Sequence, residues 1–289
     1  VFLLLALFSL DTFAQDDEVI KVDSSLVVLN ATITNAAGKP VLGLKNNQFT
    51  IYEDGKPQEI SLFETASTPF AAVILIDTSG SMEERVALAR SAAMRFLDGL
   101  RIDDVAAIYN FDSKVAEIQD FSNSRDLVDA VYDLKATGMT VLNDAIYKAA
   151  QELGSRPEKR RAIIVLSDGA DTQSKYSADK ALKAALAVNA TIYTIDMSSA
   201  DTGGRERMQS QGALKNFAEK SGGKFVATPG GAAMREAFKN IVEDLGIQYT
   251  LGYQPTNTAK DGKWRTIEVK VSGTDAQIRT RKGYQAPKK

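Results

Sequence analysis

Continuous apolar runs alternate with stretches of helical periodicity through the middle of the chain. The apolar runs lie at 71–76, 105–110, 162–166 and 191–195. Between them, apolar residues recur every three or four positions, for example from Val86 to Leu100 and from Leu142 to Leu153. A continuous apolar run fits a strand that is covered on both faces, and its alternation with helices favours a parallel sheet. We therefore predict a doubly wound α/β sheet with right-handed crossovers.

The same patterns place the other elements of this region. Residues 115–118 follow the strand at 105–110 closely enough for a hairpin, which predicts an antiparallel strand at the sheet edge. A short strand is expected near 224–227. Further helices are expected at about 125–134, 178–188, 214–220 and 232–245.

Both flanks of this region have a strand-like pattern instead. The front segment is rich in β-branched residues and contains Asp54-Gly55, a strong hairpin signal. In the tail, apolar and polar residues alternate at 247–251 and 264–271, and another strand is expected at 277–280. About four front strands and three tail strands would make a sandwich of ordinary size. We predict an α/β domain at 69–245, inserted into a small β-sandwich formed by 15–66 and 246–289; two unrelated β appendages are the alternative.

The first residues resemble a secretory signal. The apolar stretch at 1–10 is too short to span a bilayer, and Thr12-Phe13-Ala14 before Gln15 is similar to a small-residue cleavage site. We therefore interpret residues 1–14 as the remnant of a signal peptide; a buried N-terminal strand or helix is the alternative. The expectation is an exported protein, periplasmic or extracellular, with no stable membrane span after signal removal.

The composition of the chain limits the kinds of partner and of functional site that are possible. The 289 residues are 44% hydrophobic and 25% charged, as in an ordinary folded protein, and the net charge of -2 argues against a nucleic-acid partner. Cysteine and histidine are both absent. Their absence excludes thiolate metal sites, cysteine nucleophiles and every Ser-His-Asp triad.

The candidate chemistry lies where the predicted strands end. Asp77, Ser79 and Ser81 alternate directly after the first apolar run, so their oxygens can face one point. Asp168 follows the run at 162–166, and in the strand order 3-2-1-4-5-6 these two strands are neighbours at the switch point. Thr140 precedes a helix and can enter the same volume from the side. Such an all-oxygen set suits a hard cation, Mg²⁺ above all, with Mn²⁺ or Ca²⁺ as other candidates.

Each piece also has an ordinary explanation. The D-x-S-x-S pattern alone is compatible with a hydroxyl-capped helix start, Thr140 with a helix N-cap, and Asp168 before Gly169 with a turn. Their occurrence together and in order, on neighbouring strand ends, favours a metal site.

With these pieces in place, the chain resembles the von Willebrand factor type A domain and its metal-ion-dependent adhesion site. The resemblance covers about residues 69–245. It rests on D-x-S-x-S, then a Thr and then an Asp, and on runs similar to T-x-L-x-x-A-I from Thr140 and S-D-G-x-D-T from Ser167. The flanks, with Gly283-Tyr284, are similar to those of exported bacterial members. The fold that the resemblance implies is the mainly parallel, Rossmann-like sheet.

The resemblance also implies a mechanism. Ser79, Ser81 and Thr140 would contact Mg²⁺ directly, while Asp77 and Asp168 would act directly or through bound water. An open coordination position would accept a Glu or Asp side chain from a protein partner. The leading hypothesis is therefore a non-enzymatic, Mg²⁺-dependent adhesion or scaffolding module. A metal-dependent hydrolase and a structural scaffold with an unused site are the alternatives.

Other polar residues have less specific interpretations. Asp112, Asp144 and Asp171 lie near the predicted rim, where they could support the cation ligands or contact a partner, or have ordinary turn and capping roles. The basic residues at 279, 281 and 282 fit a solvated edge strand better than a binding patch.

Overall fold

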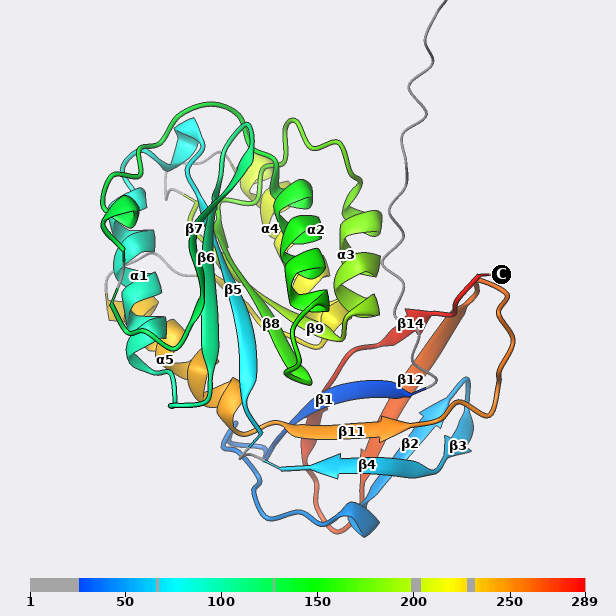
Figure 1. Ribbon diagram of the computed structural model, residues 1–289. Helices are drawn as coiled ribbons and strands as arrows, with labels where there is room; N and C mark the ends of the chain where they lie inside the picture. The colour runs from blue at the N-terminus through cyan, green and yellow to red at the C-terminus, as the bar shows by residue number, and fades with distance from the viewer. Residues whose placement is uncertain (1–25, 66–67, 127, 199–203, 228–231, 289) are drawn as a thin grey trace, which may run out of the picture.

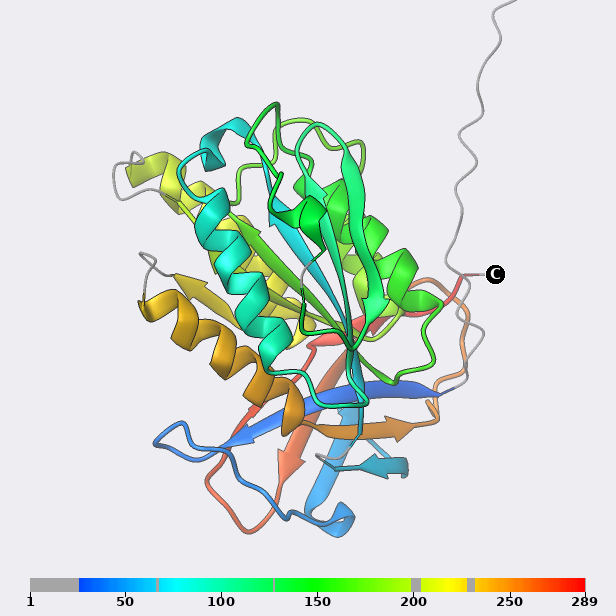
Figure 2. The same cartoon turned by 60° about the vertical axis from the view of Figure 1, so that its left-hand side comes forward.

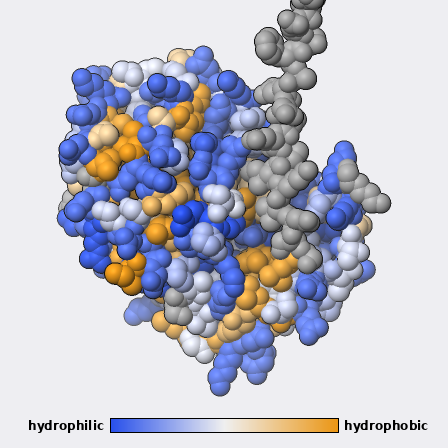
Figure 3. Space-filling view, viewed as in Figure 1, coloured by the Kyte–Doolittle hydropathy of each residue, from blue (hydrophilic) through white to orange (hydrophobic). Residues whose placement is uncertain are grey.

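The computed structural model describes residues 26–288 except 66–67, 127, 199–203 and 228–231. The proposed signal remnant at 1–14 lies outside the described residues. Figure 1 shows two bodies, an α/β domain above and a β-sandwich below. Figure 3 shows hydrophilic residues over most of the visible face of the α/β domain, with apolar ones scattered among them. No helix in the described ranges has the length and apolar character needed to cross a membrane.

The α/β domain is built on a mainly parallel sheet. Its strand order is β10-β9-β8-β5-β6-β7, in which every neighbouring pair is parallel except the edge pair β6 and β7. This is the predicted order, and the predicted antiparallel edge hairpin is confirmed. The strands are β5 (Phe70–Asp77), β6 (Val105–Phe111), β7 (Val115–Ser122), β8 (Arg160–Ser167), β9 (Ala190–Asp196) and β10 (Phe225–Ala227).

Helices cover both faces of this sheet. Side chains alternate along β5, so that Val73 and Leu75 belong to one apolar core while Ile74 and Ile76 belong to the other. One core is closed by α2 (Leu142–Gly154), α3 (Ala178–Ala187) and α4 (Gly204–Ser221). The other is closed by α1 (Val86–Asp98) and α5 (Ala232–Gly246), which come to the front in Figure 2. Burial on both faces explains why these strands are continuously apolar.

Two helix predictions need correction. The described part of 125–134 contains only a short 3-10 turn, η3 (Asp129–Val131). Side chains replace the helical hydrogen bonds there: Ser124 Oγ accepts from Asp126 N at 3.1 Å, and Gln119 Oε1 accepts from Val128 N at 3.3 Å. In contrast, α4 begins ten residues before the expected start, because its first turns are polar and carry no apolar periodicity.

The flanking segments form one β-sandwich, as predicted. Tail strand β11 (Tyr249–Tyr253) pairs between β1 (Val27–Thr34) and β4 (Ile60–Glu64), and β13 (Gln277–Arg279) pairs with β1. In the second sheet, β12 (Trp264–Val271) pairs between β2 (Phe49–Glu53) and β14 (Gly283–Gln285), and β3 (Lys56–Gln58) pairs with β2. Both sheets contribute to one apolar core, so the alternative of two separate appendages is wrong.

The basic run near the C-terminus lies at the contact between the two bodies. Arg281 is 5% exposed and donates to Leu186 O, at the end of α3, at 2.9 Å. Arg279 donates to Gly222 O at 2.7 Å and pairs with Asp244 of α5. The interpretation of these arginines as solvated is therefore wrong, because their charges reach carbonyl and carboxylate oxygens of the α/β domain.

Arg160 fixes both chain connections between the two bodies. Its guanidinium is fully buried and donates to Thr65 O (2.6 Å) and Thr68 O (3.2 Å) on the way into β5. It also donates to Gln248 O (2.5 Å) and Thr250 Oγ1 (2.9 Å) on the way out of α5. Burial lowers the pKa of Arg160 to about 10, so the side chain stays charged at neutral pH.

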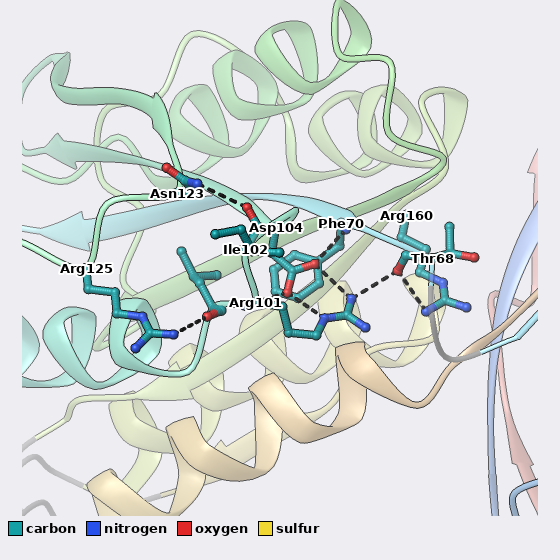
Figure 4. Close-up of polar contacts among 9 residues, drawn as sticks. Thr68, Phe70, Arg101, Ile102, Asp104, Asn123, Arg125 and Arg160 are labelled. Atoms are coloured by element: carbon teal, nitrogen blue, oxygen red, sulfur yellow. Dashed lines mark hydrogen bonds and ion pairs between the residues drawn. The ribbon is translucent and has the colours of Figure 1, made fainter.

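A second arginine supports the same junction, as Figure 4 shows. Arg101 donates to Thr68 O at 3.0 Å and forms a two-pronged ion pair with Asp104. Asp104 in turn accepts from the backbone N–H of Phe70, the first residue of β5, at 3.1 Å. The entry to β5 is thus held by side chains from two other elements.

Candidate metal centre

The turn after β5 gathers three of the five predicted ligands. Asp77 is the last residue of β5 and is fully buried, and its Oδ1 accepts from Ser79 N at 2.8 Å. The chain then makes a 3-10 turn, η2 (Gly80–Met82), which brings Ser81 Oγ within 3.2 Å of Ser79 Oγ. Ser81 is exposed, whereas Asp77 and Ser79 are buried. These oxygens therefore lead from the strand end to the surface.

The neighbouring strand β8 brings a second carboxylate to the same edge. Asp168 follows the last residue of β8, is half-buried, and lies close enough to Asp77 for their charges to interact. Burial and the charge of Asp168 raise the pKa of Asp77 to about 6, against the lowering effect of hydrogen bonds from Ser167 and Ser79. Two carboxylates held this close favour either a proton or a cation.

Ser167 is a site residue that the sequence reasoning did not single out. Its buried hydroxyl donates to Asp77 Oδ2 at 2.6 Å and accepts from Gly169 N at 2.9 Å. The signal was available, because Ser167 ends an apolar run whose parallel neighbour ends at Asp77. The hydrogen bond fixes the orientation of the Asp77 carboxylate and links the two strand ends.

Thr140 is held between the β5 and β8 loops. Gly138 O accepts from Gly80 N at 3.2 Å, which joins its loop to the β5 turn. On the other side, Thr140 N donates to Thr172 Oγ1 at 2.9 Å, and Thr140 O accepts from Thr172 N at 3.0 Å. Thr140 is 4% exposed. All five predicted residues thus lie in loops that are hydrogen-bonded to one another at the carboxyl edge of the sheet.

The acidic residues near the rim have turn and capping contacts. Asp144 accepts from Lys175 N and Tyr176 N, at 3.1 and 2.9 Å. Asp171 accepts from Asn143 N at 2.8 Å and from Ser174 Oγ at 2.6 Å. Asp112 accepts from Lys114 N at 3.1 Å within the β6–β7 turn. These contacts fix the loops around the site, which agrees with the turn and capping interpretation.

The donor set fits a hard divalent cation. Across the described ranges, no group of three or more His, Cys, Asp or Glu could hold a metal, so a cation here needs the hydroxyls. Asp77 and Asp168 supply two charges, and Ser79, Ser81 and Thr140 supply neutral oxygens. The buried Asp77 carboxylate, with its raised pKa, is costly to ionise without a compensating positive charge. Mg²⁺ would supply that charge and accepts this ligand chemistry.

Gly138 provides a test of the loop geometry. Its φ is +75°, and a Cβ there would lie 2.5 Å from Ser113 Oγ, which also accepts from Met139 N at 3.0 Å. Gly138→Ala should therefore displace the loop that carries Thr140 and weaken Mn²⁺ binding several-fold in a spectroscopic titration.

The matched control is Gly38→Ala. Gly38 has a φ of +74° but nothing within 4 Å of its would-be Cβ. Both substitutions should cost about 1 kcal/mol of stability from the positive φ. Equal Mn²⁺ affinity in the two variants would contradict the proposed role of the loop.

The α/β domain matches a known protein family. The model of the von Willebrand factor type A domain matches residues 72–228. An uncharacterized protein, sll0103, from Synechocystis sp. (strain ATCC 27184 / PCC 6803 / Kazusa) is 31% identical over 106 residues, which are 35% of this chain. That match spans 25% of the length of the curated relative.

Solved structures have the same fold. The von Willebrand factor domain of the type V pili tip protein Mfa5 from Porphyromonas gingivalis aligns with a TM-score of 0.52 at 16% identity, covering 63% of this chain and 97% of that one. A von Willebrand factor type A protein from Catenulispora acidiphila aligns with a TM-score of 0.51 at 14% identity, covering 90% of this chain and 75% of that one. At such identities these structures establish the fold. Together with the family match, they lead to one conclusion: the chain belongs to the von Willebrand factor type A domain family.

Proposed function

We propose that this protein is a Mg²⁺-dependent protein-binding module that accepts a carboxylate from its partner. The observation that carries the proposal is the buried Asp77 carboxylate, oriented by Ser79 N and Ser167 Oγ and placed beside Asp168. Ser81, two residues beyond the buried Ser79, is exposed and would place the outer side of the site at the surface. Hydrogen bonds link the strand ends and the loops around them, so the ligands would be positioned before any partner arrives.

Each site residue has a distinct role in this proposal. Ser79, Ser81 and Thr140 would hold the cation through their hydroxyl oxygens, and Asp77 and Asp168 would hold it directly or through water. A cation held largely by neutral oxygens keeps a strong attraction for an anionic one. The partner would supply it as a Glu or Asp side chain, and the loops around the site would select the partner.

The first residues of the sequence and the likeness to a pilus protein favour a role in adhesion or scaffolding outside the cytoplasm. The apolar start of the sequence supports export. Mfa5, which shares the fold, is described as a pili tip protein. A non-enzymatic role is supported by the composition, since a sequence without histidine or cysteine lacks the commonest general base and the thiol nucleophile.

Capture of partners from a native extract tests the proposal. Immobilised protein should retain specific proteins in Mg²⁺ and release them on chelation. Asp168→Asn should lose both Mn²⁺ binding and capture, because it removes one of the two charges while Asn can still accept the 3.3 Å hydrogen bond from Ala170 N.

The control is Asp112→Asn, which makes the same chemical change at a turn near the rim. It should keep both Mn²⁺ binding and capture. Equal capture by all variants, with and without metal, would favour a structural scaffold with an unused site. Turnover of a generic phosphate ester that disappears in Asp168→Asn would assign the site to hydrolysis instead.

A further inference from the structure

We propose that the outer face of the sandwich sheet formed by β14, β12, β2 and β3 binds a neutral glycan, with Trp264 as the stacking platform. The ligand class is a β-1,4-linked chain of pyranose rings whose hydroxyl groups are equatorial, so that the flat faces of each ring carry only C–H bonds. This glycan face belongs to the sandwich and not to the α/β domain that carries the metal centre. The proposal therefore goes beyond the proposed function and does not depend on it.

Trp264 begins β12 and points away from the sandwich core. Residues of β12 alternate between exposed and buried, and Trp264 belongs to the exposed set. Its indole leans over the neighbouring strand β14, because a Cβ at Gly283 would lie 2.7 Å from two atoms of its six-membered ring. The absence of a side chain at Gly283 is therefore what lets the ring lie against this strand. Trp264 is nevertheless 39% exposed, so a large aromatic surface is held in one place and remains open to solvent.

Hydrogen-bonding side chains continue from Trp264 along the same face. Thr266, Glu268 and Lys270 follow at alternate positions of β12, and all three are exposed. At about 3.3 Å per residue the row extends for about 20 Å, which gives room for an oligosaccharide. Tyr52 of β2 stands opposite Glu268, and Lys270 Nζ lies 4.9 Å from the centre of its ring. Hydroxyl, carboxylate and ammonium groups beside an aromatic ring can hydrogen-bond the hydroxyl groups at the edge of a stacked sugar.

The charged side chains of this row form a pair. Glu268 and Lys270 lie 3.5 Å apart, and both side chains are more than half exposed. Because their charges cancel, the row favours neither an anionic nor a cationic ligand, and an uncharged polyol matches it. An anionic membrane or a nucleic acid would instead need a surplus of basic side chains.

A protein partner fits this face less well than a sugar does. Stable protein interfaces cover about 800 Å² on each partner around an apolar centre. Among the large apolar side chains that are exposed in the described part of the chain, Trp264 is the one that this sheet carries. A single indole is too small for such an interface but is comparable in size to one pyranose ring. The negative face of the indole attracts the C–H bonds of that ring, which carry a small positive charge.

Tryptophan fluorescence tests the proposal directly, because Trp264 is the one tryptophan in the sequence. Cellopentaose and chitopentaose, two uncharged β-1,4-linked chains that differ in the group on C2, are titrated separately into the whole protein. A saturable shift of the Trp264 emission is expected with at least one of them, and the tighter ligand identifies the preferred group on C2. Chelation of divalent cations should leave its Kd unchanged. Maltopentaose, the α-linked isomer of cellopentaose, should bind more weakly because its chain curves away from a flat face.

Two substitutions of Trp264 separate stacking from a general apolar contact. Trp264→Leu should weaken glycan binding roughly ten-fold, measured by calorimetry, because it removes the aromatic face and keeps an apolar side chain. Trp264→Tyr should keep most of the affinity. Both variants should retain the wild-type circular dichroism and Mn²⁺ affinity, since the side chain lies outside the sandwich core.

Three results would overturn the proposal. They are no saturable change in emission with either β-linked chain, equal affinity of wild type and Trp264→Leu, and binding of maltopentaose as tight as that of the β-linked chains. A shift of the Trp264 emission on vesicles of anionic lipid, without one on glycans, would assign the face to a membrane surface instead. None of these outcomes affects the proposed function, which is tested by Mg²⁺-dependent capture of protein partners.

Discussion

Arg160→Met should lower the free energy of unfolding by roughly 3 kcal/mol and separate the unfolding of the two bodies. Methionine fills a similar volume but leaves the oxygens of Thr65, Gln248 and Thr250 without the donor they have now. Each buried acceptor that loses its partner costs about 1 to 3 kcal/mol, and relief of the buried charge offsets part of the sum. Urea denaturation should show two transitions, one by the fluorescence of Trp264, the single tryptophan, in sandwich strand β12, and one by helical circular dichroism.

The neighbouring arginine provides the control for this result. Arg161 is half-buried and donates to Val188 O at 3.0 Å, a contact within the α/β domain. Arg161→Met should lower the stability of that domain without separating the transitions. If Arg160→Met unfolds in one transition at the wild-type midpoint, Arg160 is not what couples the two bodies.

Asp77→Asn should stabilise the metal-free protein and abolish its response to Mg²⁺. In metal-free wild type, the pKa of Asp77 is raised from 3.8 to about 6. Because this pKa is raised in the folded state, protonated Asp77 stabilises the native state fully below about pH 4. That stabilisation is lost as pH rises through about 6. Two pKa units correspond to about 3 kcal/mol, so the asparagine variant should gain roughly 2 kcal/mol at neutral pH.

The measurement is the denaturation midpoint between about pH 4 and pH 8, in chelator and in Mg²⁺. Wild type in chelator should lose stability as pH rises through about 6, and Mg²⁺ should restore it because a ligand of the native state adds stability. Asp77→Asn should show neither effect. A lower stability of the variant in chelator at neutral pH would contradict the proposed cost of the buried carboxylate.

Asp196 at the end of β9 is the matched control. It too is buried and accepts from the N–H two residues on, from Ser198 at 2.8 Å, and so repeats the Asp77–Ser79 geometry. Its Oδ2 accepts from the Gln211 amide at 2.7 Å, whereas Asp77 Oδ2 accepts from Ser167 Oγ and lies near the charge of Asp168. Asp196→Asn should therefore keep the full stabilisation by Mg²⁺. The comparison separates the metal site from the turn motif that both residues share.

The sequence was informative where burial dictates composition. Strands covered on both faces must be apolar throughout, so a polar residue directly after one, such as Asp77, marks a strand end. The connection rules for parallel strands then predict that β5 lies beside β8. The order of the sheet and the meeting of the loops that carry the five proposed ligands followed from these two constraints.

Other features depend on contacts that a linear pattern does not contain. Arg279 and Arg281 look solvated in sequence, yet their guanidinium groups reach Gly222 O and Leu186 O across the contact between the two bodies. The early start of α4 was missed because a polar helical turn has no apolar periodicity. The helix expected around 125–134 failed because Gln119 and Ser124 compete for its backbone N–H groups. Each error concerns polar groups, because the pattern of hydrophobic residues does not indicate which hydrogen-bond partners a polar group will find.

The insertion of one domain into another has a mechanical consequence. A load applied at the carboxyl edge of the parallel sheet, the upper edge in Figure 1, reaches the sandwich through two chain connections. One enters β5 and the other leaves α5 (Figure 1). A domain on a single tether swivels freely under tension, but two adjacent tethers resist rotation. The orientation of the carboxyl edge therefore follows the orientation of the sandwich. Fixing the sandwich in place would also fix the direction in which this edge faces.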